Sequence, residues 1–439
     1  MREEFAFGAT PDDGEAGRYA YELAKELFPI ARSLTGPGVR ETLEVLKREL
    51  PGLEVHAVPS GTQVFDWEVP DEWHIRDAFI EGPDGKRLGE FQESNLHVLG
   101  YSEPVDRRID LDELQTHLYS LPDLPDAIPY VTSYYTRRWG FCLRHRDREA
   151  LRPGTYRVKI DATLEPGVLN YGELTLPGDR EDEIFLSTYI CHPSLANNEL
   201  SGPVVATALG RWLRSRSRRP YSIRLVFVPE TIGSITYLSR NLPKLKERVR
   251  AGFNISCIGD DRAYSWLPSR AGDTLADRAA LHALRHVTGS FVKYTWWDRG
   301  SDERQYCAPG VDLPVTSIMR SKYGEYPEYH TSLDNLDLIS RTGLEGGFRA
   351  LQAAIVSVEL DAYHRMTVLG EPQLGKRGLY PTVSTRSSGA QVRRMMNLIS
   401  QLDGHRSLLD IAEALGEPIW ELDEIVQRLT SEGLVERGR

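Results

Sequence analysis

The sequence predicts an α/β fold in which a mostly parallel sheet is flanked by helices, with a β-rich inserted domain and a small helical domain near the C-terminus. From about residue 183 onward, runs rich in β-branched residues alternate with helical patterns, an order typical of parallel sheets covered on both faces. Residues 61–170 instead show short alternating runs separated by Gly, Pro and Asp, which is typical of β-rich units. With 439 residues, the chain exceeds what one hydrophobic core normally organises.

The N-terminal region has a helical pattern. Apolar residues recur at helical spacing from Tyr19 to Leu50, and a Gly-Pro-Gly sequence interrupts them at residues 36–38, which predicts two helices. We assign residues 1–60 to helices of the main domain, residues 61–175 to the inserted domain and residues 176–368 to the main α/β domain. Within the last range, helices are expected over residues 201–214, 234–249, 274–288 and 343–363.

Residues 379–439 hold three short helical patterns, then a Gly turn and a final strand. This order resembles a winged helix-turn-helix. The segment has seven arginines against nine acidic residues, so its charge does not suit a surface that binds DNA phosphates. A docking or dimerisation role is favoured, and a homo-oligomer formed through this domain is one expectation.

The composition is that of a soluble globular protein, with 40% hydrophobic and 27% charged residues. No run approaches the roughly 20 apolar residues that a membrane helix needs, and the first residues lack the apolar core of a signal peptide, so a cytoplasmic protein is expected. The net charge of -11 disfavours nucleic-acid and membrane partners. Four dispersed cysteines without a CxxC pair predict neither disulfides nor a thiolate zinc site: Cys142, Cys191, Cys257 and Cys307.

The first chemistry-bearing segment follows the strand pattern EIFLSTYI, where CHPSLANNELSGP crowds a His, two Asn and a Glu before a helix. Such polar density is costly unless a ligand or metal uses it. His192 and Glu199 are therefore candidate metal ligands. The alternative is that the Asn and Ser residues cap the helix and His192 is an ordinary turn residue.

Further candidates follow the next strands of the sheet. Glu230 ends the run SIRLVFVP, where partial burial would raise its pKa toward the value useful for a general base, although an acid here could also cap the following helix. Asp260 and Asp261 follow the third strand, and His330 lies in a loop dense with Tyr and acidic residues. Because a parallel sheet brings such loops together, these side chains are expected to form one site.

These motifs, in this order, resemble those of the zinc aminopeptidase-like peptidases. His192, the ANNELSG segment and Glu230 with its Gly-Ser turn carry the resemblance, which covers about residues 183–363. The whole chain resembles aminopeptidase-like proteins with a β-rich inserted domain and a C-terminal winged helix, some of them associated with polysaccharide or natural-product biosynthesis. The most specific matches lie in GSDERQYCAPGVDLP and YHTSLDNLD, at Ser301, Asp302, Gly310, Val311, Pro314, Tyr329, His330, Thr331, Asp334 and Asp337.

The resemblance implies a zinc-dependent amide or peptide hydrolase. The metal is expected on His192, Glu199 and His330, with Asp260 or Asp261 as a substitute for a family ligand that this chain lacks, and Glu230 is expected to be the general base. Further residues are candidates for binding a small peptide or amide substrate: Tyr329, Tyr326, Arg299 and Arg320.

The chain departs from the family pattern at several ligand positions. Ser194 stands where the family has the Asp of its first motif, Asn198 at the bridging Asp, and Thr231 at the second residue of a Glu-Glu pair. Because two zinc ions need a bridging carboxylate and several anionic ligands, one zinc ion per chain is expected. Two alternatives stay open, a single-zinc acyl transfer or cyclisation enzyme and a non-catalytic assembly or regulatory protein that keeps the fold.

Overall fold

The alternating strand and helix patterns fold into one eight-stranded sheet at the centre of the molecule. The computed structural model describes residues 14–379 and 386–438, with side chains omitted for 386–388. The four inner strands, β12, β11, β13 and β16, run parallel, whereas the edge pairs include antiparallel neighbours. In sheet order the strands are β1 (Glu54–Pro59), β10 (Val168–Leu176), β12 (Tyr221–Val228), β11 (Arg180–Tyr189), β13 (Val249–Asn254), β16 (Val315–Met319), β14 (Ser265–Leu267) and β15 (Val292–Lys293).

Helices cover both faces of this sheet, as predicted. One hydrophobic core joins the sheet to α1 (Glu15–Leu27), α2 (Pro37–Glu49), α5 (Ser201–Ser215), α7 (Leu275–Val287) and α9 (Arg341–Leu360). A second core holds α6 (Ile232–Arg248) and α8 (Glu303–Tyr306) and continues into the inserted domain. Two short helical turns lie at strand ends, η2 (Ala196–Leu200) and η3 (Trp296–Asp298).

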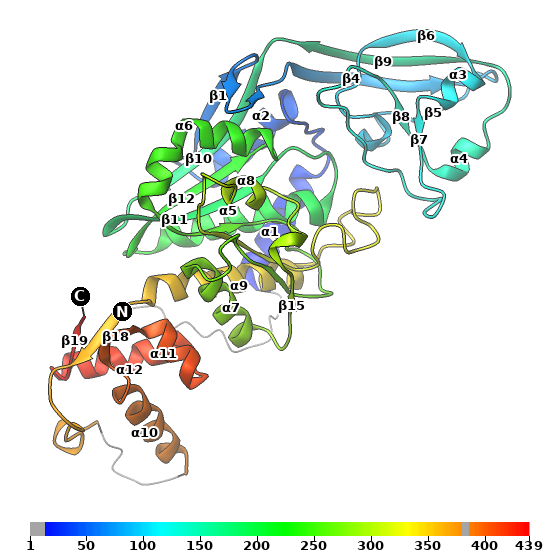
Figure 1. Ribbon diagram of the computed structural model, residues 1–439. Helices are drawn as coiled ribbons and strands as arrows, with labels where there is room; N and C mark the ends of the chain where they lie inside the picture. The colour runs from blue at the N-terminus through cyan, green and yellow to red at the C-terminus, as the bar shows by residue number, and fades with distance from the viewer. Residues whose placement is uncertain (1–13, 380–385, 439) are drawn as a thin grey trace.

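The inserted domain projects from one end of the sheet (Figure 1). The chain enters the inserted domain after β1 and returns to the main sheet at the start of β10, where Pro59 pairs with Val168. Since β10 belongs to the main sheet, the insertion ends near residue 167 rather than at 175. Its elements are β2 (Gln63–Val64), β3 (Trp67–Glu68), β4 (Glu72–Glu81), β5 (Arg87–Leu88), η1 (Asn95–His97), β6 (Val105–Asp110), α3 (Leu111–Gln115), β7 (Leu118–Tyr119), β8 (Phe141–Cys142), α4 (His145–Glu149) and β9 (Thr155–Glu165).

The C-terminal domain contains the three helices and final strand that the sequence predicted. It begins earlier than residue 379, because β17 (Tyr363–Met366) is the central strand of its sheet. That strand follows α9 directly, so the main domain and the C-terminal domain are continuous. The other elements are η4 (Gly375–Arg377), α10 (Arg386–Ile399), β18 (Asp403–Ser407), α11 (Leu408–Leu415), α12 (Ile419–Ser431) and β19 (Val435–Arg437).

Acidic residues of the C-terminal domain dock it against α7. Glu413 forms an ion pair with Arg285, and its Oε1 lies 2.6 Å from His282 Nδ1. His282 Nε2 accepts a hydrogen bond from the Ile419 amide at 2.9 Å, so both ring nitrogens are engaged. Asp410 pairs with Arg278 in the same interface. Part of the acidic excess of this domain therefore serves to fix it to the main domain.

Candidate functional site

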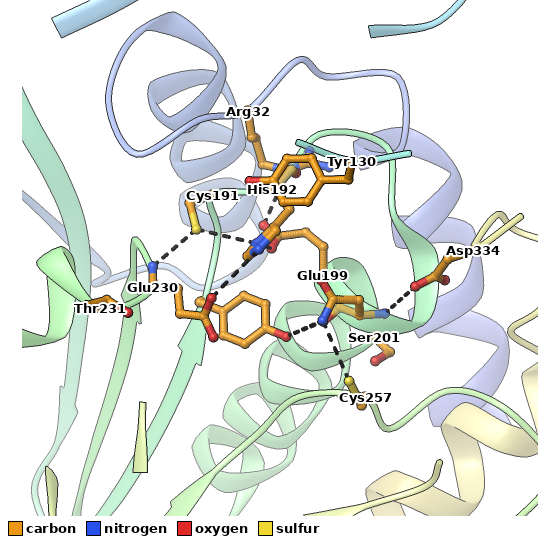
Figure 2. Close-up of polar contacts among 12 residues, drawn as sticks. Arg32, Tyr130, Cys191, His192, Glu199, Ser201, Glu230, Thr231, Cys257 and Asp334 are labelled. Carbon is orange, nitrogen blue, oxygen red and sulfur yellow. Dashed lines mark hydrogen bonds and ion pairs between the residues drawn. The ribbon is translucent and has the colours of Figure 1, made fainter. Parts of the chain in front are cut away.

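The predicted site residues meet at the carboxyl edge of the parallel strands. His192 follows β11, and Glu230 follows β12. Figure 2 shows their side chains directed toward one another, with Glu199 on the other side of the imidazole. His330 lies in the loop between β16 and α9, and its ring centroid is 5.5 Å from that of His192. The topology thus brings together four of the residues that the sequence singled out.

His192 is held in one orientation by carboxylates on both sides. Its Nδ1 lies 2.8 Å from Glu199 Oε2, and its Nε2 lies 3.7 Å from Glu230 Oε2. Burial alone would lower the pKa of this imidazole, but the hydrogen bond and charge of Glu199, with the charge of Glu230, raise it above its ordinary value. Because Glu199 engages Nδ1, the Nε2 atom is the one that faces Glu230, whose side chain is 22% exposed whereas that of Glu199 is fully buried, and we call this the open side of the site.

Glu199 lies on the buried side of the imidazole, opposite Glu230. Its side chain is fully buried, and Oε1 lies 3.5 Å from Nε of Arg32, which is also fully buried. Arg32 donates further hydrogen bonds to the carbonyl oxygens of His192 at 3.0 Å and Leu27 at 2.7 Å. This placement differs from the predicted ligand role, because a carboxylate between an arginine and Nδ1 orients the histidine.

One compact group of potential ligands lies on this inner side. Cys191 Sγ, His192 Nδ1 and a Glu199 oxygen are within 4.8 Å of one another. However, the guanidinium of Arg32 adjoins Glu199 and would repel a cation. Burial also raises the pKa of the Cys191 thiol well above its ordinary value, so the sulfur stays protonated and is a poor ligand. We therefore interpret the inner side as a hydrogen-bonded support for His192.

Glu230 occupies the turn between β12 and α6 and is the partly exposed carboxylate of the site. Its amide donates to Cys191 Sγ at 3.2 Å. Burial raises the pKa of this carboxyl, while the positive charges of His192 and Arg304 oppose the shift. The next residue, Thr231, has a φ of 64°, and its amide donates to Asp302 Oδ1 at 2.7 Å. Thr231 therefore has a strained backbone that the buried Asp302 carboxylate holds in place, and this contact fixes the turn that carries Glu230.

His330 also has left-handed backbone geometry, with a φ of 55°. A segment of the inserted domain holds it there: the Tyr130 amide donates to the His330 carbonyl at 2.8 Å, and the Ser332 amide donates to the Ile128 carbonyl at 2.8 Å. The Tyr130 ring lies 5.0 Å from both imidazoles. Burial and the nearby His192 lower the pKa of His330 to about 3, so its ring is neutral near pH 7. The inserted domain thus forms one wall of the site.

Asp334 organises the π-helical turn η2, which carries Asn198 and Glu199. Its carboxylate accepts hydrogen bonds from the amides of Asn197 at 2.6 Å and Asn198 at 3.0 Å, and from the Tyr326 hydroxyl at 2.9 Å. Burial raises the pKa of Asp334 to about 6 despite these donors. Asp334 therefore acts on the site through the backbone that presents Asn198 and Glu199.

Replacing Asp334 by Ala should lower the free energy of unfolding by about 3 kcal/mol, because buried backbone amides lose their acceptor. The measurement is chemical denaturation, with Asp337→Ala, an acidic residue of the same loop, as the control variant. A loss below about 0.5 kcal/mol, the range of ordinary surface substitutions, would show that the η2 turn does not depend on this carboxylate.

The other predicted residues divide into two groups. Tyr329 lies at the site, with its ring stacked 3.9 Å from that of His330. Asp260 is engaged by other contacts, because its oxygens accept hydrogen bonds from Asn197, Ser321 and Arg262. Such an engaged carboxylate has little capacity left for a metal.

The remaining predicted side chains also serve other contacts. Tyr326 bonds to Asp334 as described above. Arg320 is buried, with its guanidinium 3.9 Å above the Tyr264 ring. Arg299 is exposed and lies 4.9 Å from the Trp296 ring. These placements give no support to a substrate contact by Tyr326 or Arg320.

Two residues of the site were missed by sequence reasoning. Arg32 lies between the two N-terminal helices, and Tyr130 lies in the inserted domain. Neither adjoins a motif, and no local pattern links either position to His192. An isolated Arg or Tyr in a sequence carries no signal of this kind, so only the folded chain identifies them.

Comparisons with known proteins agree with this architecture. Residues 21–361 match a family described as a domain of unknown function, DUF4910, and residues 361–437 match a winged helix-turn-helix family. A Clostridium acetobutylicum protein, provisionally named as a polysaccharide biosynthesis protein with an aminopeptidase-like domain, is 42% identical over 407 residues, covering 92% of this chain and 93% of the relative.

Solved structures extend the comparison to the fold. A crystal structure from Clostridium acetobutylicum, provisionally named as a peptidase, is 40% identical, with a TM-score of 0.91 and 97% of each chain covered. A zinc aminopeptidase from Bacillus subtilis is 14% identical, with a TM-score of 0.56, covering 79% of this chain and 95% of its own. The main domain therefore has the aminopeptidase-like fold. Within residues 14–379 and 386–438, every helix is too short or too polar to cross a membrane.

Proposed function

The chain belongs to the DUF4910 family, here followed by a winged helix-turn-helix, and from this premise we propose that it is a metal-dependent hydrolase of amide or peptide bonds. The observation that carries the proposal is the arrangement of His192 between two carboxylates. Glu199 holds its Nδ1 atom at 2.8 Å, which leaves Nε2 directed toward Glu230 and the open side. An imidazole fixed in this way by a carboxylate is typical of histidines that bind metals.

The donor atoms near His192 suit one zinc ion. His330 Nε2 and Asn198 Oδ1 are buried and have no hydrogen-bond partner among the described residues. His192 Nε2 and His330 Nε2 are two ligands of the kind that catalytic zinc sites take from the protein, and Asn198 Oδ1 is the candidate third, although an amide oxygen is not one of the usual zinc ligands. All three groups would bind as neutral donors, whereas a pair of dications needs a bridging carboxylate, which supports a single ion. Bound there, zinc would lower the pKa of a water molecule and polarise the substrate carbonyl.

The protein's own groups would carry the proton. Glu230 is the carboxylate on the open side, and its raised pKa suits a base that accepts a proton and later gives it to the leaving amine. Glu199 and Arg32 would keep His192 in one tautomer throughout. Tyr329, stacked on His330 and kept protonated because burial raises its pKa, could donate a hydrogen bond to the substrate.

The name of the 42% identical relative refers to polysaccharide biosynthesis. On that basis, we propose that the amide substrate carries a saccharide. An N-acylated amino sugar or a sugar-linked peptide has the required bond. This substrate class is favoured over a free oligopeptide. A saccharide-bearing amide needs a surface outside the metal site that binds the sugar, whereas a free oligopeptide does not.

Metal analysis tests the proposal most directly. Wild-type protein should bind about one zinc ion per chain, and His192→Ala and His330→Ala should each reduce zinc affinity by at least about 10-fold, because each removes an imidazole ligand. His405→Ala, which changes an exposed histidine of the C-terminal domain, should bind zinc as the wild type does. Unchanged zinc affinity in either site variant would contradict the metal assignment, and circular dichroism would establish that both variants fold.

A further inference from the structure

Three exposed aromatic side chains gather on one part of the inserted domain. Phe65 and Trp67 belong to the hairpin formed by β2 and β3, and Tyr135 belongs to a later loop. Their exposed fractions are 51%, 39% and 54%, respectively. The Trp67 and Tyr135 rings meet edge to face at 5.7 Å. We call Phe65, Trp67 and Tyr135 the aromatic rim.

The hairpin that carries Phe65 and Trp67 has a strained backbone at its turn. Phe65 has a φ of 55° and occupies the first position of a two-residue turn, where a glycine would be unstrained. The Gln63 side chain fixes the turn by donating to the carbonyl oxygens of Phe65 at 2.8 Å and Trp67 at 2.9 Å. Valines on both sides of the tip are buried and anchor it. A rigid turn with a strained, exposed aromatic residue points to a binding role.

Two further tyrosines link the chain segment of Tyr135 to the metal site. Tyr135 follows Tyr134, whose hydroxyl lies 2.7 Å from that of Tyr130. The Tyr130 ring in turn contacts His192 and His330. The segment that carries Tyr135 is therefore joined, through Tyr134 and Tyr130, to the wall of the metal site.

The chemistry of the rim suits a saccharide. Aromatic and acidic residues alternate in the hairpin tip as Phe65, Asp66, Trp67 and Glu68, all of them exposed. Flat rings can cover the C–H faces of a pyranose, since both surfaces are apolar and aromatic rings offer large contact areas. The neighbouring carboxylates accept hydrogen bonds from sugar hydroxyls. The same acids would repel nucleic acid and anionic lipid.

We propose that the aromatic rim is a saccharide-binding subsite that holds the sugar portion of the substrate outside the metal site. This inference rests on the proposed function for its link to catalysis. Binding of the sugar itself does not depend on hydrolysis, because none of the three rim residues touches the proposed metal ligands. The two ideas can therefore fail separately.

The test uses the full chain with a panel of N-acetylglucosamine, glucose, mannose and galactose oligomers. Saturation-transfer NMR should detect contact with sugar ring protons, and calorimetric titration should give the dissociation constant. Trp67→Ala and Tyr135→Ala should raise that constant by about 10-fold, the scale of one lost aromatic contact. Trp297→Ala, which removes an 82% exposed tryptophan outside the rim, should leave it unchanged.

Phe65→Gly separates binding from folding. Glycine relieves the left-handed strain, so the Tm should hold or rise while saccharide affinity falls. Glu230→Gln should bind saccharides like the wild type, so loss of hydrolysis alone leaves the rim proposal standing.

Failure of every oligomer to bind, or unchanged affinity in Trp67→Ala, would overturn the proposal. A change of oligomeric state in Trp67→Ala, measured by light scattering and without saccharide binding by the wild type, would assign the rim to a protein interface and also overturn it.

Discussion

Hydrolysis by the Glu230→Gln variant should fall by roughly 10²- to 10⁴-fold, the usual contribution of a general base. Glutamine keeps the shape of the side chain and its hydrogen-bonding capacity but cannot accept the proton. The Glu230 amide, which bonds to Cys191, is unchanged by the substitution, so the turn should stay intact. Zinc content and Tm should therefore match those of the wild type. The measurements are turnover of an N-acylated substrate, zinc per chain and thermal unfolding.

The same variant discriminates two other roles for Glu230. If the carboxylate were a zinc ligand, both metal and activity would be lost, since a neutral amide is a poorer ligand. If it only capped α6, both would survive with at most about 1 kcal/mol of stability lost. Glu44→Gln, at an exposed position on α2, is the matched control and should behave as wild type. Wild-type turnover by Glu230→Gln would refute the mechanism.

Replacing Arg32 by Met should lower the free energy of unfolding by about 3 kcal/mol. The substitution keeps an unbranched apolar stem but removes the guanidinium that lies 3.5 Å from Glu199 and bonds to two carbonyl oxygens. Breaking one partner of a buried ion pair leaves the other charge uncompensated, which is why the cost is large. Denaturant unfolding at pH 7 measures it. Arg18→Met, at an arginine of α1 outside the site, is the control.

A double variant separates the ion pair from the remaining contacts of Arg32. Arg32→Met combined with Glu199→Gln should be more stable than the sum of the two single losses predicts, because no buried charge is then left unpaired. Glu199→Gln alone should lower zinc affinity by roughly 10- to 100-fold, as expected for loss of a group that orients a metal-binding histidine. Additive losses would show that Arg32 and Glu199 do not act as a pair.

The sequence by itself determined the fold class and most of the helices. The helix expected over residues 201–214 spans Ser201–Ser215, and that expected over 274–288 spans Leu275–Val287. These predictions succeeded because hydrophobic periodicity is a local property of the chain. The meeting of His192, Glu230 and His330 also followed from the sequence, since parallel strands place their carboxyl ends at one edge. The boundaries placed at residues 175 and 379 were less accurate, because β10 and β17 pair with strands distant in the sequence.

Only the tertiary structure decided what each polar group of the site does. Spacing in the sequence made Glu199 a candidate ligand, yet its carboxylate lies between His192 Nδ1 and Arg32. Asp260 follows a strand as expected but is engaged by three neighbouring residues. Tyr130 contacts both imidazoles from the inserted domain, far from His192 and still farther from His330 along the chain. The physical reason is that a side chain's role depends on which atoms face it, and those atoms belong to segments that meet only when the chain is folded.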